Sequence, residues 1–206
     1  MLTRGNALLN LNKTNLIQTF TLKQPVPYHF ESLKRVAHLN GEALRKASVL
    51  IGFVERPSGI HVLLTKRAMH LKHHPGQVSF PGGKYEESDR SIIETAIREA
   101  NEEVGIGTSQ IEVFGTLPEL NTISRFSVTP TLAFIDPTYQ LKVDRNEVEE
   151  AFEVPIKVIF DSKNLISQTF SVNNERHRVF CIAYENHYIW GMTAQIIHAM
   201  QKHLFH

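Results

Sequence analysis

The sequence predicts a mixed α/β fold, of the α+β kind, in which a mixed β-sheet lies between helices. Three observations support this prediction. Strand-like and helix-like segments are interleaved without strict alternation, residues 89–104 carry the strongest helical pattern, and residues 193–204 carry a second amphipathic pattern. With 206 residues, the chain is long enough to bury a core as one globular domain with additions.

The first half of the chain is predicted to contain a helix followed by short strands. Leu33, Val36, Ala37 and Leu44 recur with helical spacing, so we expect a helix over residues 29–46. Apolar runs separated by turn residues predict the strands that follow. These strands cover residues 48–55, 60–65 and 77–80, with a hairpin turn at 56–59, a basic loop at 66–77 and a glycine turn at 81–83.

The second half is predicted to begin with the strongest helix, over residues 89–104. Ser88 or Asp89 can cap this helix at its start, and Gly105 ends it. Apolar spacing and turn residues predict the remaining elements. These are strands over 113–117 and 128–135, a short helix over 146–152, a hairpin of 167–172 and 178–184 around Asn173-Asn174, and a closing helix over 193–204.

Charge and composition exclude several classes of protein. The formal net charge is +1, so no overall basic field draws the chain onto nucleic acid or an acidic membrane. No apolar run approaches the ~20 residues that cross a bilayer, and a signal-peptide pattern is absent, so we expect a cytoplasmic protein. Cys181 is the single cysteine; it forms no internal disulfide, and we interpret it as a small buried residue of a strand.

Residues 1–45 are predicted to be an N-terminal helical extension packed on a main domain of residues 46–206. No Asp or Glu occurs before Glu31, which is weakly similar to an organelle transit peptide. Arginine is scarce and serine is absent in that stretch, so an ordinary peripheral segment is favoured.

The predicted helix over residues 89–104 gathers three carboxylates on one face. Glu99, Glu102 and Glu103 follow i, i+3, i+4 spacing, so their negative charges repel one another. A divalent metal would compensate, because Mg²⁺ takes hard oxygen ligands and keeps substrate phosphates in its shell. A solvated acidic face is the alternative. The glycine turn directly upstream and the adjacent Arg98 favour the metal site, because glycine lets backbone approach a ligand and arginine orients carboxylates.

The segment from Gly83 to Ile106 resembles the Nudix box, written GX5EX7REUXEEXGU. Its second half, Arg98-Glu99-Ala100-Asn101-Glu102-Glu103-Val104-Gly105-Ile106, matches at every specified position. The first half is one residue longer than usual, so the first glutamate of the box falls on Asp89 or on Arg90, depending on the direction of counting. Glu86, Glu87 and Asp89 are the candidates to replace it.

The preceding stretch resembles a more specific motif, LLTXRSX3RX3GX3FPGG, of the coenzyme A pyrophosphatase branch of that family. The matching residues are Leu63-Leu64-Thr65-Lys66-Arg67-Ala68, Leu71 and His74-Pro75-Gly76-Gln77-Val78-Ser79-Phe80-Pro81-Gly82-Gly83. Ala68 replaces the usual Ser and Lys72 the usual Arg, which removes bidentate phosphate binding at that position. The extra residue in the box and the closing Ile189-Trp190-Gly191-Met192-Thr193-Ala194 are also similar to this branch.

The resemblance implies a Nudix-type α/β/α sandwich that hydrolyses a pyrophosphate bond. Coenzyme A or acyl-coenzyme A would be cleaved to 3′,5′-ADP and 4′-(acyl)phosphopantetheine. One or more Mg²⁺ or Mn²⁺ ions would be held by Glu99, Glu102, Glu103 and the Gly83 carbonyl. Glu99 would be the general base, with Arg98 beside it and Glu147 as the more distal candidate.

The loop chemistry fits a phosphate-rich small molecule, because cations gather there in a near-neutral chain. The predicted substrate-binding residues are Lys66, Arg67, Lys72, His74, Gly76, Gln77 and Phe80. A solvated surface loop is the alternative reading, and a metal site at His73 and His74 is disfavoured because no neighbouring ligand set matches.

Two other functions stay open at this point. The first is a Nudix pyrophosphatase for NADH, ADP-ribose or an oxidised nucleotide. The second is a non-catalytic Nudix domain that senses a nucleotide, although such domains typically lose box carboxylates and all three remain here. A nucleic-acid-binding module lacks support from charge or from aromatic residues. A homodimer also stays open.

Overall fold

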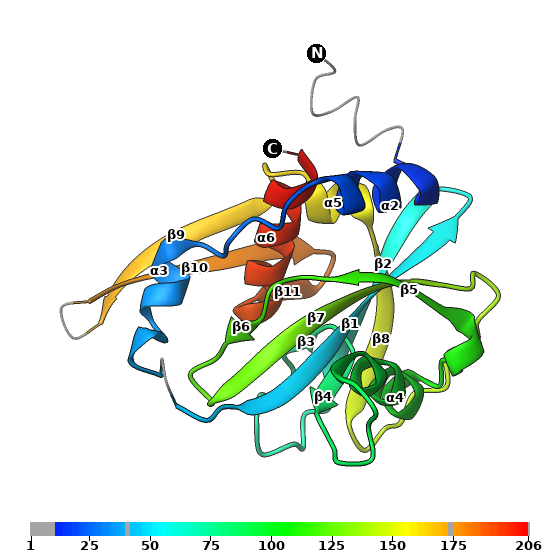
Figure 1. The fold of residues 1–206 in the computed structure, drawn as a ribbon, viewed down its shortest axis with the longest axis horizontal. Helices are drawn as coiled ribbons and strands as arrows, with labels where there is room; N and C mark the ends of the chain where they lie inside the picture. Colours follow the sequence, from blue (N-terminus) through cyan, green and yellow to red (C-terminus); the bar gives the residue numbers. More distant parts are fainter. Residues whose placement is uncertain (1–10, 40–41, 173–174, 206) are drawn as a thin grey trace.

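The computed structural model describes residues 11–39, 42–172 and 175–205. A large mixed sheet forms the centre of the molecule, with helix α4 (Ile92–Val104) on one face. The other face is covered by helix α2 (Lys13–Leu22), helix α6 (Met192–Phe205) and a second, smaller sheet (Figure 1). The predicted arrangement, a mixed sheet between helices, is therefore confirmed.

The large sheet has eight strands within the described part of the chain. The strands are β1 (Arg45–Arg56), β2 (Gly59–Arg67), β3 (Val78–Ser79), β4 (Gly82–Lys84), β5 (Ile111–Thr116), β6 (Leu120–Asn121), β7 (Phe126–Ile135) and β8 (Val148–Pro155). The main path runs β3-β2-β1-β7-β5, with β4 paired to β1, β6 to β7 and β8 to β2. Strands β1 and β7 are parallel and the other pairs are antiparallel, so the sheet is mixed.

Strand β1 is buried along most of its length because both faces of the sheet are covered. Leu50 and Val54 point to the core beneath α4, whereas Ile51 and Phe53 point to the larger core on the other face. This alternation separates two cores across one strand. Every residue of β1 or β2 that lies near the site can therefore be assigned to one face.

The smaller sheet and the remaining helices complete the second face. Its strands are β9 (Leu165–Val172), β10 (Glu175–Tyr184) and β11 (His187–Trp190), in the order β11-β10-β9. The shorter helices are α3 (Phe30–Lys34), α5 (Ile156–Phe160) and the 3₁₀ turns Ala37–Leu39 and Thr108–Gln110. Leu16 of α2 is buried in the larger core, so this N-terminal helix packs on the domain. In the described residues no helix is long and apolar enough to cross a membrane.

Helix α4 has caps at both ends. The Ser91 hydroxyl accepts a hydrogen bond from the backbone N–H of Glu94, so Ser91 is the N-cap, and not Ser88 or Asp89 as predicted. Gly105 adopts φ 76° at the other end, and its N–H bonds to the last turn, which confirms the predicted stop. Asp89 does not cap the helix, because its carboxylate binds Arg98 instead.

Two predicted helices are wrong. In the described residues 29–39 and 42–46, the structure has only α3 and a 3₁₀ turn before β1 begins at Arg45. Residues 146–152 were expected as a helix, yet Val148–Pro155 is strand β8. Cross-strand pairing with β2, from His61↔Pro155 to Arg67↔Val148, decides this outcome, and pairing between distant segments leaves no local signal.

Other differences concern short elements. Helix α5 and strands β4, β6 and β11 were not predicted, because each is short or lacks a clean apolar period. Helix α2 lies within the helical extension predicted for residues 1–45, for which no helix bounds were predicted before residue 29. The late hairpin is confirmed as β9 and β10, although its turn at Asn173-Asn174 lies outside the described residues. Cys181 lies in β10, as expected, but it is only partly buried.

Candidate active site

Helix α4 presents its three carboxylates at different depths. The Glu103 residue is 4% exposed, whereas the side chains of Glu99 and Glu102 are 13% and 55% exposed. The carboxylates therefore do not form one solvated face. Their burial increases from Glu102, at the surface, to Glu103, in the protein interior.

Glu103 is a buried carboxyl that lacks a full set of partners. Its Oε2 is buried and has no hydrogen-bond partner among the described residues, although the Gly82 backbone N–H bonds to its carboxyl. Burial, the largest cause, and the negative charges of Glu99 and Glu147 together raise its pKa to about 8, against the opposing charge of Arg67. Such a group gains strongly from a nearby cation.

Glu99 faces the glycine turn. Burial raises its pKa, the Arg98 guanidinium opposes this, and the charges of Glu102 and Glu147 add to the rise. A Cβ placed on Gly83 would lie 2.2 Å from Glu99 Oε1. Only glycine lets strand β4 approach this carboxylate so closely without displacing it.

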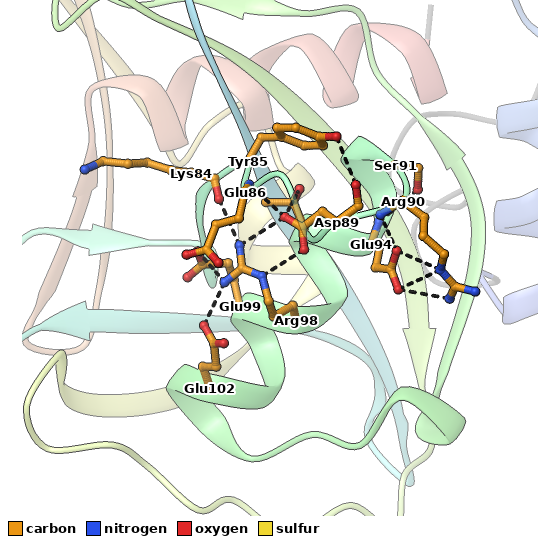
Figure 2. A network of polar contacts seen from close by, with 11 residues as sticks. Lys84, Tyr85, Glu86, Asp89, Arg90, Ser91, Glu94, Arg98, Glu99 and Glu102 are labelled. Carbon is orange, nitrogen blue, oxygen red and sulfur yellow. Dashed lines mark hydrogen bonds and ion pairs between the residues drawn. The ribbon is translucent and has the colours of Figure 1, made fainter.

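Arg98 connects the carboxylates to the loop before the helix (Figure 2). Its Nη1 donates to Glu99 Oε1 at 3.1 Å and to Glu102 Oε2 at 2.8 Å. Its Nη2 donates to the Lys84 carbonyl oxygen at 2.9 Å, and its Nε donates to Asp89 Oδ1 at 2.9 Å. The guanidinium is thereby fixed in one orientation and fixes Glu99 in turn.

Asp89 forms an ion pair with Arg98. Its carboxylate also accepts from the Thr95 hydroxyl at 2.8 Å and from the Glu86 backbone N–H at 3.0 Å. The hydrogen bond from Arg98 is the main reason that the pKa of Asp89 falls to about 2. Arg90, the other candidate from counting, instead pairs with Glu94 away from this network (Figure 2). Asp89 thus holds the arginine, whereas Glu86 contributes its backbone.

Glu147 comes to the same place from a distant part of the chain. It lies just before β8, and its carbonyl oxygen accepts from the Ala68 N–H at 2.9 Å. Its negative charge raises the pKa of both Glu99 and Glu103. The structure therefore brings together Glu99 and Glu147, the two residues that the sequence analysis named as candidates for the general base.

The cations of the basic loop point in different directions. Arg67 ends β2 on the face of α4, and its charge opposes the rise in the pKa of Glu103. Lys66 lies two residues after Leu64, which packs in the larger core, so alternation along β2 assigns Lys66 to that face, although the pairing with β8 shifts register between Lys66 and Arg67. Lys72, His73 and His74 are exposed in the loop after β2, where His74 has φ 55°.

The other predicted binding residues lie against neighbouring parts of the chain. Gly76 adopts φ 69° beside Met69, and Gln77 lies next to Gly191 at the start of α6. Phe80 is 2% exposed and packs within the larger core, so its ring offers no free face to a ligand. We therefore leave Phe80 out of the proposed binding surface.

The donor atoms around Glu103 are hard oxygens, the kind that a divalent metal such as Mg²⁺ takes. The described residues contain no group of three or more His, Cys, Asp or Glu side chains already arranged to hold a metal ion. Arg98 Nη1 binds both Glu99 and Glu102, so these two carboxylates are paired with a guanidinium. The unpartnered Oε2 of Glu103, hard oxygen donors and the close approach at Gly83 nevertheless fit Mg²⁺ or Mn²⁺.

Comparison with known proteins identifies the family. The model of the NUDIX domain matches residues 44–170, which is more than half of the chain. The chain belongs to the Nudix family. A protein of Pectobacterium atrosepticum described as "Uncharacterized Nudix hydrolase NudL" is 40% identical over 156 residues, 76% of this chain and 81% of the relative. A protein of the same description from Escherichia coli O1:K1 is 40% identical over 161 residues, 77% of this chain and 83% of the relative.

Solved Nudix structures are similar over part of this Nudix chain. A Nudix hydrolase of M. smegmatis, RenU, matches 55% of this chain and 73% of its own at 25% identity, with a TM-score of 0.47. A C. elegans Ap4A hydrolase matches 55% of this chain and 82% of its own at 20% identity, with a TM-score of 0.46. Family membership confirms the predicted hydrolase class, whose members generally use divalent metals such as Mg²⁺ or Mn²⁺.

Proposed function

We propose that this Nudix hydrolase is a metal-dependent pyrophosphohydrolase whose preferred substrate is coenzyme A or acyl-coenzyme A. The products would be 3′,5′-ADP and 4′-phosphopantetheine or its acyl form. One observation carries the catalytic part: Glu103 is buried beside Glu99 and Glu147, with an unpartnered Oε2. Three mutually repelling carboxylates next to a glycine turn gain most from a shared cation.

The residues that would hold Mg²⁺ or Mn²⁺ are Glu99, Glu102, Glu103 and the carbonyl of Gly83. When bound, the metal would offset the charge of the diphosphate and lower the pKa of water at the site. Arg98 holds Glu99 in place through the hydrogen bond at 3.1 Å, and Asp89 holds Arg98. The chain thus orients its own carboxylates through a hydrogen-bonded sequence of side chains.

The general base is proposed to be Glu99, with Glu147 as the alternative. Both charges act on Glu103, so both lie close to the buried end of the site. Glu99 accepts from Arg98, which orients its carboxylate and favours the ionised form that can take a proton from water. Replacement of Glu99 by Gln should then remove more activity than replacement of Glu147.

Coenzyme A is favoured because positively charged or protonatable side chains lie both beside the carboxylates and on the exposed loop after β2. Arg67 lies close enough to act on Glu103, which fits the diphosphate that is cleaved. Lys72 and His74 lie on the exposed loop, which fits a phosphate further along the ligand, such as the 3′-phosphate. A nearly neutral chain needs such local placement of positive charge.

A substrate comparison tests the proposal. Coenzyme A, acetyl-coenzyme A, NADH and ADP-ribose are incubated with the protein and Mg²⁺ or Mn²⁺, and products are separated by chromatography. The highest kcat/KM should fall on a coenzyme A compound, with almost no turnover after chelation or in the Glu103→Gln variant. A preference for NADH or ADP-ribose would place the protein in another substrate class.

A non-catalytic role in nucleotide sensing is the second candidate. Tight binding of a ligand with no product released under any metal condition would favour it. The retained carboxylates oppose this candidate, since a sensor has no need of the buried, unpartnered Glu103. Light scattering of the same preparation measures whether the protein is a homodimer, which we leave as a proposal.

A further inference from the structure

A second buried polar group lies on the face of the large sheet that is opposite α4. His187 of β11 stacks on Phe152 of β8, with ring centroids 3.8 Å apart and an angle of 17° between the planes. Its Nε2 is 3.0 Å from Glu150 Oε2. The side chain of His187 is only 10% exposed, so nine-tenths of it is buried.

This histidine lies at the same end of β2 and β8 as the active site. Lys66 is the cross-strand neighbour of Glu150, and Arg67, the next residue, acts on Glu103 from the other face. Glu147, three residues before Glu150, acts on the α4 carboxylates as well. The two faces of this strand end therefore carry different groups: carboxylates and Arg67 on one, Lys66 and His187 on the other.

Glu150 determines which nitrogen of His187 carries a proton. A carboxylate only accepts hydrogen bonds, so the hydrogen between them belongs to Nε2. In the neutral imidazole, Nδ1 then has a lone pair and accepts. When the imidazole is neutral, the carboxylate thus leaves Nδ1 of His187 as a hydrogen-bond acceptor.

That acceptor is left without a partner. Nδ1 is buried and forms no hydrogen bond with any described residue. A buried polar atom that lacks a partner destabilises the folded chain, so a group that supplies a donor would be favoured there. The exposed Glu150 and the partly exposed Lys66 leave this strand end accessible to a ligand.

We propose that His187 is a substrate-binding residue that accepts a hydrogen bond from a neutral N–H group of the ligand. This inference rests on the proposed function, because coenzyme A offers two such groups: the exocyclic amine of adenine and the amides of pantetheine. Nδ1 is covered by its neighbours, so binding includes a small shift of the ring or of Glu150. The scissile diphosphate lies on the α4 side of the strand end, and the N–H group lies on the side of β11.

The test uses His187→Phe, which keeps an aromatic ring on Phe152 and removes both nitrogens. The matched control is Tyr188→Phe, since Tyr188 is 68% exposed and points away from His187 along β11. Binding of 3′,5′-ADP and of 4′-phosphopantetheine is measured separately by calorimetry, with thermal unfolding of each variant. Glu150→Ala is the second variant, because it frees Nε2 from its partner.

One of the two products should bind His187→Phe about five- to tenfold more weakly, while the other product binds normally. Loss on 3′,5′-ADP identifies the adenine amine, and loss on 4′-phosphopantetheine identifies an amide. For coenzyme A the KM should rise with little change in kcat. Tyr188→Phe should match the unmodified protein, and Glu150→Ala should weaken the same product as His187→Phe.

Unchanged binding of both products by His187→Phe, with or without a lower melting temperature, would overturn the inference and leave His187 with a packing role. If His187→Phe does not fold, unchanged binding by Glu150→Ala overturns it equally. Failure of the unmodified protein to cleave coenzyme A or to bind either product would instead refute the proposed function.

Discussion

Gly83 and Glu99 are so close that a Cβ on the glycine would lie 2.2 Å from Glu99 Oε1 and 2.4 Å from its carboxyl carbon. The glycine belongs to β4, which pairs with β1, and the glutamate belongs to α4. Strand β4 and helix α4, which form for separate local reasons, therefore meet at the carboxylate of Glu99. The absence of a side chain on Gly83 is what allows them to meet.

Gly83→Ala should lower activity with little effect on stability. The new methyl group would press on the far end of a flexible side chain, which can rotate away without moving the backbone. Glu99 would then leave its position beside Arg98, and kcat should fall by about tenfold or more. Gly107→Ala is the control, because a Cβ there meets nothing closer than 3.5 Å. Equal kcat in both variants would contradict the role of Gly83.

Asp89→Asn should destabilise the protein at neutral pH. The pKa of Asp89 lies at about 2, below its ordinary value of 3.8, so its ionised form stabilises the folded state by about 2 kcal/mol. This stability is present above pH 3.8 and is lost as pH falls toward 2. Urea unfolding between pH 2 and 7 should show the two proteins converging at acid pH. Glu94→Gln, at the exposed pair with Arg90, should show no comparable effect.

The metal-free protein should lose stability as the pH rises from 5 to 8. The pKa of Glu103, at about 8, lies above its ordinary 4.5, so the folded state holds a proton that the unfolded state releases. That contribution is complete below pH 4.5 and disappears as pH passes 8. Melting temperatures with a chelator should record the decline. The decline should be smaller in Glu103→Gln, and Mg²⁺ should offset it; a flat profile would contradict the raised pKa.

Helix α4 was predictable because its signals are local. An apolar stripe, three carboxylates and Gly105 all lie within one stretch, so spacing alone placed Glu99 and Glu103 near each other. The N-cap was misplaced because Asp89 has a non-local partner, Arg98, nine residues away. A carboxylate at a loop can cap a helix or bind an arginine, and only the fold distinguishes these outcomes.

The rest of the site depends on contacts between distant strands. Residues 146–152 carry charges at helical spacing, but pairing with β2 makes Val148–Pro155 a strand and brings Glu147 to α4. The same pairing sets Lys66 opposite Glu150 and Arg67 opposite Val148 across a shift in register, whereas the motif specifies only Arg67 of the two. His187 gave no signal in the sequence, because its role arises from the position of β11 against β8.

The last prediction separates Arg67, at the end of β2, from Lys72 in the loop that follows. Arg67 acts on the buried carboxylates, so Arg67→Ala should lower kcat by about tenfold to a hundredfold for both coenzyme A and 3′-dephospho-coenzyme A.

Lys72 is exposed on the loop, so Lys72→Ala should instead raise the KM for coenzyme A several times more than for the dephospho compound. Steady-state kinetics of the two variants on the two substrates gives four comparisons. If Arg67→Ala discriminates between the substrates as Lys72→Ala does, then Arg67 reads the 3′-phosphate and not the diphosphate, because a residue that contacts only the diphosphate affects alike two substrates that share it.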